Sequence, residues 1–330
     1  MFRLKTVIIT FIFGFICFSF LATIFGYSSY DSPYPPNTYK SKIINNEQNE
    51  NHEMLQDVIY SKFQNVYFSV IDFYVGNIRQ RYLKHGNEQG QVTWVTLKEN
   101  GQNGFEVDKN VVKAIYYRFS ILAPFIVNKN LKDFSPNMSI LLFGLGGGAL
   151  TNYLANLPNM PNLTTIEIDP TMKEISMKWF NLKESERNKI IIGDGVKFIE
   201  KTNQKFDSII LDACTNNFSS QIICPVQSFL NFNVISNLSS KLKPNGVFSA
   251  NIGLSTLKGY KKALNKILKK YSKVFKLCFI LYATANYILV CSNDSTAEIV
   301  TSFNERFQNL PIYLQKSLKA QFEVYNPEKL

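Results

Sequence analysis

The sequence predicts an α/β protein built on a mostly parallel, doubly wound sheet of seven strands with an antiparallel last strand. Two observations lead to this class. Between residues 135 and 295, short runs of β-branched and aromatic residues alternate with segments of helical apolar spacing. The last two runs, 274–282 and 287–290, are joined by a loop too short for a parallel crossover. The sheet is therefore expected to end in an antiparallel hairpin.

The first five strands of this sheet are expected to be parallel, with helices between them. The strands are expected at 140–143, 164–168, 189–192, 207–211 and 247–251. The helices are expected at 149–157, 170–180 and 226–242, with a turn at 243–246 and a basic helix before the final hairpin. Asp169 precedes Pro170, an order typical of an N-cap followed by the first helical residue.

A smaller β-rich region precedes the main sheet. Between Glu53 and Lys98, short runs of β-branched and aromatic residues flank the turn-prone segment 85–91, which indicates antiparallel hairpins. Residues 110–126 have helical apolar spacing and end near Pro124. The predicted organisation is an N-terminal β-hairpin subdomain with an entry helix at 53–130, followed by the main domain at 131–330.

The first 27 residues predict a membrane anchor. Residues 7–25 carry no charge and are long enough to cross a bilayer, whereas the apolar core of a secretory signal peptide is shorter. Arg3 and Lys5 precede them, so the positive-inside rule places the N-terminus in the cytoplasm. We expect a single-pass signal-anchor protein with a linker at 28–52 and a lumenal or extracellular main domain. A cleaved signal peptide is the alternative.

Histidine and cysteine are too scarce and too scattered to predict a metal site. The chain has two histidines and five cysteines, with no CxxC pair. Four of the cysteines, Cys214, Cys224, Cys278 and Cys291, lie beyond the apolar segment. Cysteines in predicted strands, such as Cys278 and Cys291, are more often small core residues than disulfide partners. Core packing is therefore favoured, with disulfides as the alternative.

One predicted helix explains most of the net charge of +11. Eight lysines occupy it without an acid between them: Lys258, Lys261, Lys262, Lys266, Lys269, Lys270, Lys273 and Lys276. Apolar residues recur at helical spacing among these lysines, which indicates an amphipathic helix with a solvated basic face. A contact with an acidic protein or with anionic lipid headgroups is the alternative. No nucleic-acid partner is expected.

A glycine-rich turn follows the first strand and opens a helix. Gly144, Gly146, Gly147 and Gly148 would let a nucleotide or amino-acid ligand lie against the backbone and the helix N-terminus. Glu167 lies at the end of the second strand, at the position of an acid that binds ribose hydroxyls. These residues alone fit a NAD-type and an S-adenosylmethionine-type cofactor equally well.

Further acids lie at the ends of the next two strands. Asp194 and Gly195 follow the third strand, and Asp212 directly follows the fourth. Because ligands bind at the carboxyl ends of parallel strands, acids at these positions are well placed for function. An acid after the third strand can accept from an adenine amine, whereas one after the fourth faces the reacting centre. The structural alternatives are a helix cap at Asp194 and a local turn at Asp212.

Five sequence motifs along this domain are LLFGLGGGALTNYL, IEIDPTMKEI, IIGDGVKFI, FDSIILDA and LKPNGVF. With them the chain resembles the spermidine-synthase-like methyltransferases, and in particular the members of that family that modify translation elongation factor 1A. The resemblance covers about 64–293. It implies a Rossmann-like fold and S-adenosyl-L-methionine as the cofactor.

The resemblance also implies roles for the residues at the strand ends. The glycines would line the methionine portion of the cofactor, Glu167 would hold the ribose hydroxyls, and Asp194 would bind the adenine. Asp212 would lie on the reaction side. The implied cofactor-binding residues are Gly144, Gly146, Gly148, Glu167, Asp194 and Gly195.

The chain departs from the aminopropyltransferases of this family. Those enzymes carry a DxxD pair after the fourth strand and a Tyr-Gln-Glu motif in the entry helix, which together bind and deprotonate a polyamine. Here Thr215 replaces the second acid, and the entry helix carries Arg118. A diamine with two ammonium groups would lose an acid and meet an arginine, so polyamine synthesis is the second choice.

We therefore expect an S-adenosyl-L-methionine-dependent methyltransferase of a protein amine, tethered to a membrane. In-line methyl transfer mainly requires that nucleophile and methyl group are held in near-attack geometry. Asp212 is the expected catalytic residue, which orients or deprotonates the amine. Tyr116, Tyr117 and Asn216 are expected to line the substrate. A non-catalytic membrane-anchored binding module is a further alternative, and the resemblance suggests a homodimer formed through the N-terminal hairpins.

Overall fold

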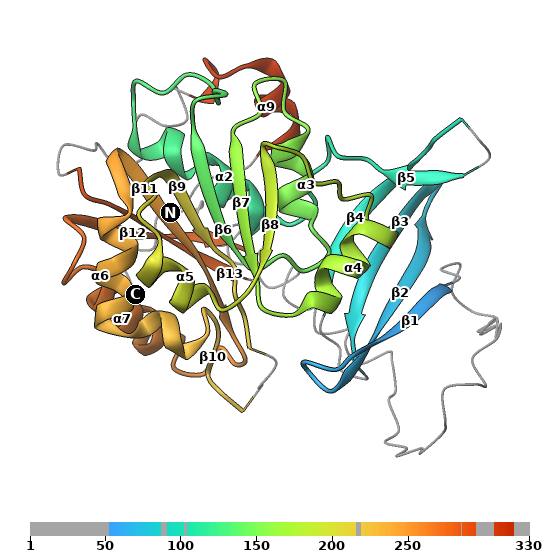
Figure 1. Cartoon of the computed structure of the whole chain (residues 1–330), viewed down its shortest axis with the longest axis horizontal. Coiled ribbons are helices and arrows are strands. Elements are labelled where there is room, and N and C mark those ends of the chain that lie inside the picture. Colours follow the sequence, from blue (N-terminus) through green and yellow to red (C-terminus); the bar gives the residue numbers. More distant parts are fainter. Residues whose placement is uncertain are drawn as a thin grey trace, which may run out of the picture. The chain divides into compact units, whose positions relative to one another are not determined.

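The computed structural model describes residues 53–86, 91–101, 104–215, 219–284, 286–294 and 307–319 (Figure 1). The main sheet has the order β12-β13-β11-β9-β6-β7-β8. Its strands are β6 (Ser139–Phe143), β7 (Asn162–Glu167), β8 (Asn188–Ile192), β9 (Phe206–Leu211), β11 (Leu242–Leu254), β12 (Leu277–Ala283) and β13 (Asn286–Ser292). The pairs from β8 to β11 are parallel, and β13 is antiparallel to both of its neighbours. The predicted mostly parallel sheet with one antiparallel strand is confirmed.

A short eighth strand, β10 (Ile222–Cys224), was not predicted. It pairs antiparallel with the end of β11. Strand β11 also differs from the prediction, because it runs through the expected turn at 243–246. Its register with β9 shifts there, between Leu242 and Val247. The segment is therefore an irregularity inside a strand.

Helices pack on both faces of the main sheet (Figure 1). One core contains side chains of α2 (Ile115–Val127), α3 (Ala149–Ala155) and α9 (Ile312–Ser317), and the other contains those of α5 (Gly195–Lys201), α6 (Phe232–Ser240) and α7 (Tyr260–Tyr271). Strand β6 serves both cores, since Ile140 and Leu142 face the first and Leu141 and Phe143 the second. This alternation explains why its continuous apolar run forms a strand buried on both faces.

Two of the predicted helices differ from the observed ones. The segment 226–242 forms a 3₁₀ helix, η2 (Gln227–Leu230), followed by α6, because the Asn231 side chain accepts from the Asn233 N–H at 2.9 Å and caps a new helix. Helix α2 begins at Ile115, five residues later than predicted, and includes Pro124 because its last two turns, which end at Val127, are buried in the core. Helix α4 (Pro170–Trp179) begins as predicted, with Asp169 as its N-cap.

The N-terminal region forms the predicted antiparallel hairpins. Its sheet contains β1 (Met54–Ser61), β2 (Val66–Val75), β3 (Ile78–His85), β4 (Gln91–Glu99) and β5 (Phe105–Val107), each paired with the next. Apolar side chains of this sheet, including Phe68 and Leu83, pack against Met172 and Ile175 of α4. A small separate core therefore joins the two sheets through α4.

A buried ion pair strengthens this junction. Asp72 of β2 is fully buried, and its Oδ1 lies 2.6 Å from Nε of Arg81 on β3. Arg81 also donates from Nη1 to the carbonyl of Trp179 at 2.6 Å, at the end of α4. The guanidinium thus connects the N-terminal sheet to the main domain.

The predicted localisation needs correction. Within the residues that the structure describes, no helix is long and apolar enough to span a membrane. The longest of them, α2, has 13 residues, whereas a span needs about 20. The prediction of a single-pass membrane protein with a lumenal or extracellular domain is therefore wrong on the described structure. The apolar pattern from which it came, at 7–25, and the linker at 28–52 lie outside the described residues.

The four cysteines beyond residue 200 form two disulfides. One joins Cys214 to Cys224, and the other joins Cys278 of β12 to Cys291, its direct neighbour on β13. The expectation that Cys278 and Cys291 are unpaired core residues is therefore wrong, although Cys291 is fully buried. The strand register brings the two side chains together, and sequence spacing alone does not reveal that register.

Replacement of Asp72 by alanine is expected to lower the free energy of unfolding by about 3 to 5 kcal/mol, because Arg81 would remain buried without its counter-ion. Urea unfolding followed by circular dichroism measures the change. Glu106→Ala is the control, since it removes an exposed ion pair with Lys98 and should cost less than about 1 kcal/mol. Equal losses for the two variants would contradict this account.

Candidate active site

The predicted site residues lie along one edge of the main sheet. The glycine turn follows β6, Glu167 ends β7, Asp194 comes shortly after β8, and Asp212 directly follows β9. These four strands are adjacent and parallel, so their carboxyl ends meet at the same edge. The fold therefore gathers side chains that are up to 68 residues apart in the sequence.

Gly144 is the residue in the glycine turn that no other amino acid can replace without a shift of the backbone. Its φ is +92°, in the left-handed region, and a β-carbon there would lie 2.5 Å from the carbonyl oxygen of Asp212. The turn therefore passes directly against the end of β9. This close approach leaves a surface of backbone next to the acid.

Thr93, which was not predicted, covers part of this turn. Its Oγ1 accepts from the N–H of Gly147 at 2.7 Å, and its side chain is buried. Thr93 lies on β4, so a side chain of the N-terminal sheet fixes the glycine turn of the main domain. Nothing in the local pattern of β4 distinguishes this threonine from other strand residues.

Glu167 fixes the same turn from the other side. Its Oε2 accepts from the N–H of Leu145 at 2.7 Å and its Oε1 from the N–H of Asp169 at 2.9 Å. Burial raises the pKa of this carboxyl, and the backbone hydrogen bonds oppose the increase. Each carboxylate oxygen has a second lone pair, so the group can also accept from the hydroxyls of a ligand.

The structural alternative for Asp194 is confirmed. Its Oδ1 accepts from the N–H groups of Val196 and Lys197 at 2.8 and 3.4 Å, which caps α5. A role toward a ligand stays a prediction. Gly195 has a packing role, because a β-carbon on it would lie 2.7 Å from the ring of Phe143.

Asp212 is the acid on which the predicted side chains converge. Asn251 donates from Nδ2 to its Oδ1 at 2.8 Å, and the hydroxyls of Tyr116 and Tyr117 on α2 are the other donors that lower its pKa. Burial raises the pKa of Asp212 to about 6, and these three donors partly oppose the increase. The carboxyl therefore changes its charge in the range where general bases work best.

The two tyrosines remain donors toward Asp212. Burial and the nearby carboxylate both raise the pKa values of Tyr116 and Tyr117 well above their usual value. Their rings lie next to each other, with centroids 4.4 Å apart. The structure thus brings Tyr116, Tyr117 and Asp212 together, whereas Asn216 lies outside the described residues. Asn251 was not predicted, and its only signal is an amide among the mostly apolar residues 247–254.

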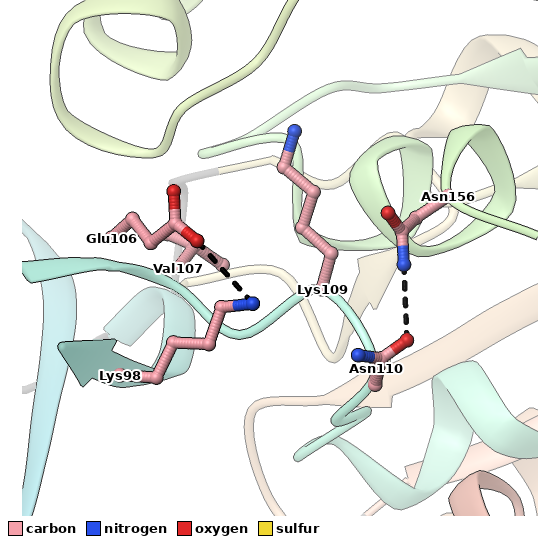
Figure 2. A pocket seen from close by; sticks show the side chains of 6 residues that line it. All are labelled: Lys98, Glu106, Val107, Lys109, Asn110 and Asn156. Carbon is pink, nitrogen blue, oxygen red and sulfur yellow. Dashed lines mark hydrogen bonds and ion pairs between the residues drawn. The ribbon is translucent and has the colours of Figure 1, made fainter. Parts of the chain in front are cut away.

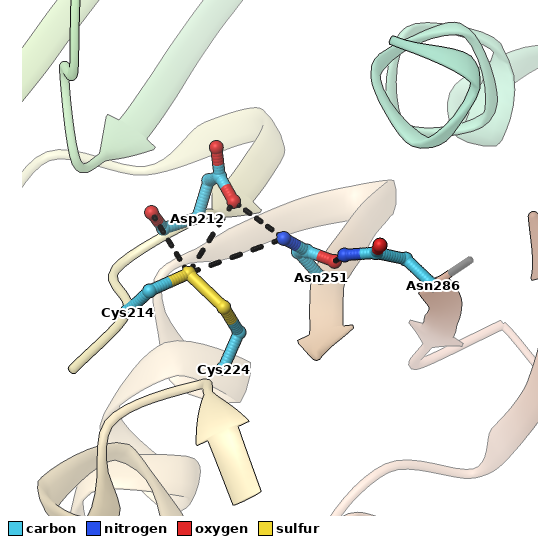
Figure 3. Close-up of a disulfide and its surroundings, with 5 residues drawn as sticks. All are labelled: Asp212, Cys214, Cys224, Asn251 and Asn286. Atoms are coloured by element: carbon cyan, nitrogen blue, oxygen red, sulfur yellow. Dashed lines mark hydrogen bonds between the residues drawn. A yellow bond between two sulfur atoms is a disulfide. The ribbon is translucent and has the colours of Figure 1, made fainter. Parts of the chain in front are cut away.

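The Cys214–Cys224 disulfide lies beside Asp212 (Figure 3). The Cys214 sulfur is 3.9 Å from Oδ1 of Asp212, and because a disulfide sulfur has no proton to donate, this is a packing contact. Two backbone hydrogen bonds flank the disulfide, from Thr215 N–H to Ile223 and from Val226 N–H to Ala213. The segment after Asp212 is thereby attached to β10.

A cavity of about 210 Å³ lies elsewhere, between β4, β5 and the end of α3 (Figure 2). Its lining groups bond mainly to each other or to backbone. Lys98 pairs with Glu106 at 3.3 Å, Asn156 donates to Asn110 at 3.0 Å, and Lys109 donates to the carbonyl of Asn181. None of the predicted site residues lines it. The strand-end acids, rather than this cavity, define the candidate active site.

Fold and site together define a methyltransferase-like α/β protein. A glycine turn follows β6, and acids lie at the carboxyl ends of β7, β8 and β9. Residues 125–297 match the spermine/spermidine synthase domain, and the chain belongs to that family. The resemblance derived from the motifs is confirmed.

Relatives of this chain include methyltransferases. An eEF1A lysine and N-terminal methyltransferase homolog of Drosophila melanogaster is 30% identical over 169 residues, which are 50% of this chain and 25% of that protein. The chain thus spans about a quarter of the length of such relatives.

Two solved structures have the same fold. Human methyltransferase-like protein 13, in complex with SAH, has a TM-score of 0.50 and 23% identity, over 66% of this chain and 95% of that chain. A probable spermidine synthase from Corynebacterium glutamicum has a TM-score of 0.59 and 15% identity, over 84% and 99%. At these identities the likeness concerns the fold alone.

Gly144→Ala is expected to lower the free energy of unfolding by about 2 kcal/mol or more, because the ends of β6 and β9 must separate to admit a methyl group. Gly193→Ala is the matched control, since no atom lies within 4 Å of its β-carbon position. Its effect should stay within about 1 kcal/mol. Chemical denaturation of both variants measures the difference, and similar losses would refute the close-approach argument.

Proposed function

We propose that this chain is an S-adenosyl-L-methionine-dependent methyltransferase whose acceptor is an amine of a protein. The observation that carries the proposal is the setting of Asp212, which accepts a hydrogen bond from Asn251 and has Tyr116 and Tyr117 as further donors, directly beside the glycine turn. The names of the curated relatives support both the reaction and a protein as the acceptor.

The residues of the site fit S-adenosyl-L-methionine. The glycine turn offers backbone without side chains, Gly144 lying against Asp212. The carboxylate of Glu167 is available for ribose hydroxyls, and the second oxygen of Asp194 for the adenine amine. Gly146, Gly148 and Gly195 complete the proposed cofactor site. When bound, the cofactor supplies an electrophilic methyl group on a sulfonium.

The remaining chemistry falls to Asp212 and its neighbours. An ionised Asp212 would accept a hydrogen bond or a proton from the incoming amine. The lone pair of the amine nitrogen would then be free to attack the methyl group. Tyr116 and Tyr117 would orient that carboxylate and place aromatic faces near the positive charge. Because displacement requires alignment above all, the main contribution of these residues is to position the acceptor.

Aminopropyl transfer to a polyamine is the alternative within the family. The replacement of the second acid by Thr215 still disfavours it. Arg118 disfavours it less than expected, because its guanidinium donates to the carbonyls of Val112 and Lys319 at 2.8 Å each. Membrane tethering is no part of the proposal, and a homodimer stays a prediction.

Calorimetric titration of the full chain is expected to give micromolar binding of S-adenosyl-L-methionine and none of NAD. Glu167→Ala should lose this binding, because the variant lacks both the proposed ribose acceptor and the hydrogen bond to the glycine turn. Binding of decarboxylated S-adenosylmethionine alone would favour the aminopropyltransferase. A lack of binding to all three compounds would favour a non-catalytic module.

Transfer of radiolabelled methyl groups to purified eEF1A is expected to fall about tenfold in kcat/KM between pH 7 and pH 5. The value of kcat/KM falls with falling pH because the proposed base, Asp212, is active when ionised and has a pKa of about 6. Asp212→Asn should bind S-adenosyl-L-methionine normally, transfer methyl groups at least about a hundredfold more slowly and show no acid limb. Unchanged activity in this variant would rule out Asp212 as the base.

A further inference from the structure

We propose that Asn251 and Asn286 are positioning residues for Asp212, forming a relay of side-chain amides that holds a donor toward its carboxylate. The relay crosses three adjacent strands at the edge that carries the site. Asp212 follows β9, Asn251 lies on β11, and Asn286 begins β13. The functional meaning of the relay rests on the proposed role of Asp212. The hydrogen bonds of the relay do not depend on that role.

The contacts form one continuous chain (Figure 3). Nδ2 of Asn286 donates to Oδ1 of Asn251 at 2.7 Å, and Nδ2 of Asn251 donates to Oδ1 of Asp212 at 2.8 Å. The Asn251 side chain is only 3% exposed, so solvent does not readily replace either bond. A buried amide with both ends bonded has a single favourable orientation.

The direction of the relay matters chemically. A side-chain amide has a donor end and an acceptor end, whereas an ionised carboxylate only accepts. Without Asn286, Asn251 could rotate and turn its oxygen toward Asp212, where two acceptors would repel each other. Asn286 has an NH₂ group that satisfies the oxygen of Asn251 and so keeps the NH₂ of Asn251 on the carboxylate.

The other groups around Asp212 do not duplicate this function. Tyr116 and Tyr117 approach from α2, a different element, and within the described residues the oxygen of Asn251 accepts from Asn286 rather than from them, so they do not fix the direction of its amide. The Cys214 sulfur is part of a disulfide and has no proton. Within the described residues, the groups that interact with the carboxylate are thus two tyrosines, one disulfide sulfur and Asn251. Of the groups that lower the pKa of Asp212, Asn251 has the largest effect, through its hydrogen bond.

Nuclear magnetic resonance of the Asp212 side-chain carbon tests the relay in the full chain. Aspartate labelled with carbon-13 at Cγ gives the titration curve, and the signal that disappears in Asp212→Asn identifies the residue. In Asn251→Ala the titration midpoint is expected to move up by about one pH unit, since a donor to the charged form is lost. In Asn286→Ala it should move in the same direction by a smaller amount.

Ser249→Ala is the matched control. Ser249 lies two residues before Asn251 on the same strand and is fully buried, and its hydroxyl has no hydrogen-bond partner. Its removal should leave the midpoint unchanged. If Asn251→Ala does not fold, Asn286→Ala carries the test, because Asn286 is less buried and begins its strand.

Two outcomes would overturn the relay: an unchanged midpoint in both asparagine variants, or an equal movement in Ser249→Ala. The titration needs neither cofactor nor acceptor, so a failure of the methyltransferase proposal would leave its result standing. If methyl transfer is observed, the acid limb of kcat/KM should move with the midpoint while the affinity for S-adenosyl-L-methionine stays the same. A loss of affinity without a moved limb would indicate a merely structural role.

Discussion

The close approach of two strand ends is the constraint on which the whole site depends. The N–H of Asp212 donates to the carbonyl of Phe143 at 2.8 Å, and the next residue, Gly144, then lies against the Asp212 carbonyl without room for a β-carbon. This contact places the glycine turn and the acid side by side. Because both follow adjacent parallel strands, their proximity is a product of sheet register and does not depend on long loops.

The centre of the main sheet could be predicted from the sequence because β6 and β9 are buried on both faces. Such strands are nearly continuous apolar runs between turn residues. Strands β7 and β8 contain short β-branched runs, and all four strands from β6 to β9 lie within two residues of their predicted limits. Positions directly after these runs were therefore also predictable, which is why Gly144, Glu167 and Asp212 were found. Helix limits were less certain, since a single cap at Asn231 divides one predicted helix into two.

The remaining parts of the site depend on contacts between distant segments. Thr93 and Asn251 resemble ordinary strand residues in their local sequence, and only the packing of the sheets gives them partners. The two disulfides could not be predicted either, because cysteine spacing does not determine which sulfurs pair. For Asp194 the sequence left a cap and a ligand contact open, and one carboxylate has enough oxygens to serve both.

The bond from Gly147 to Thr93 bears on how this protein can be divided. The match to the spermine/spermidine synthase domain begins at residue 125, yet Thr93 lies upstream of it. A fragment cut at that boundary would leave the Gly147 amide without its acceptor and expose the apolar side of α4 that faces Phe68 and Leu83. The start of the matched domain therefore does not coincide with the limit of the packing around the site, and any transplant of this centre into another scaffold must carry β4 with it.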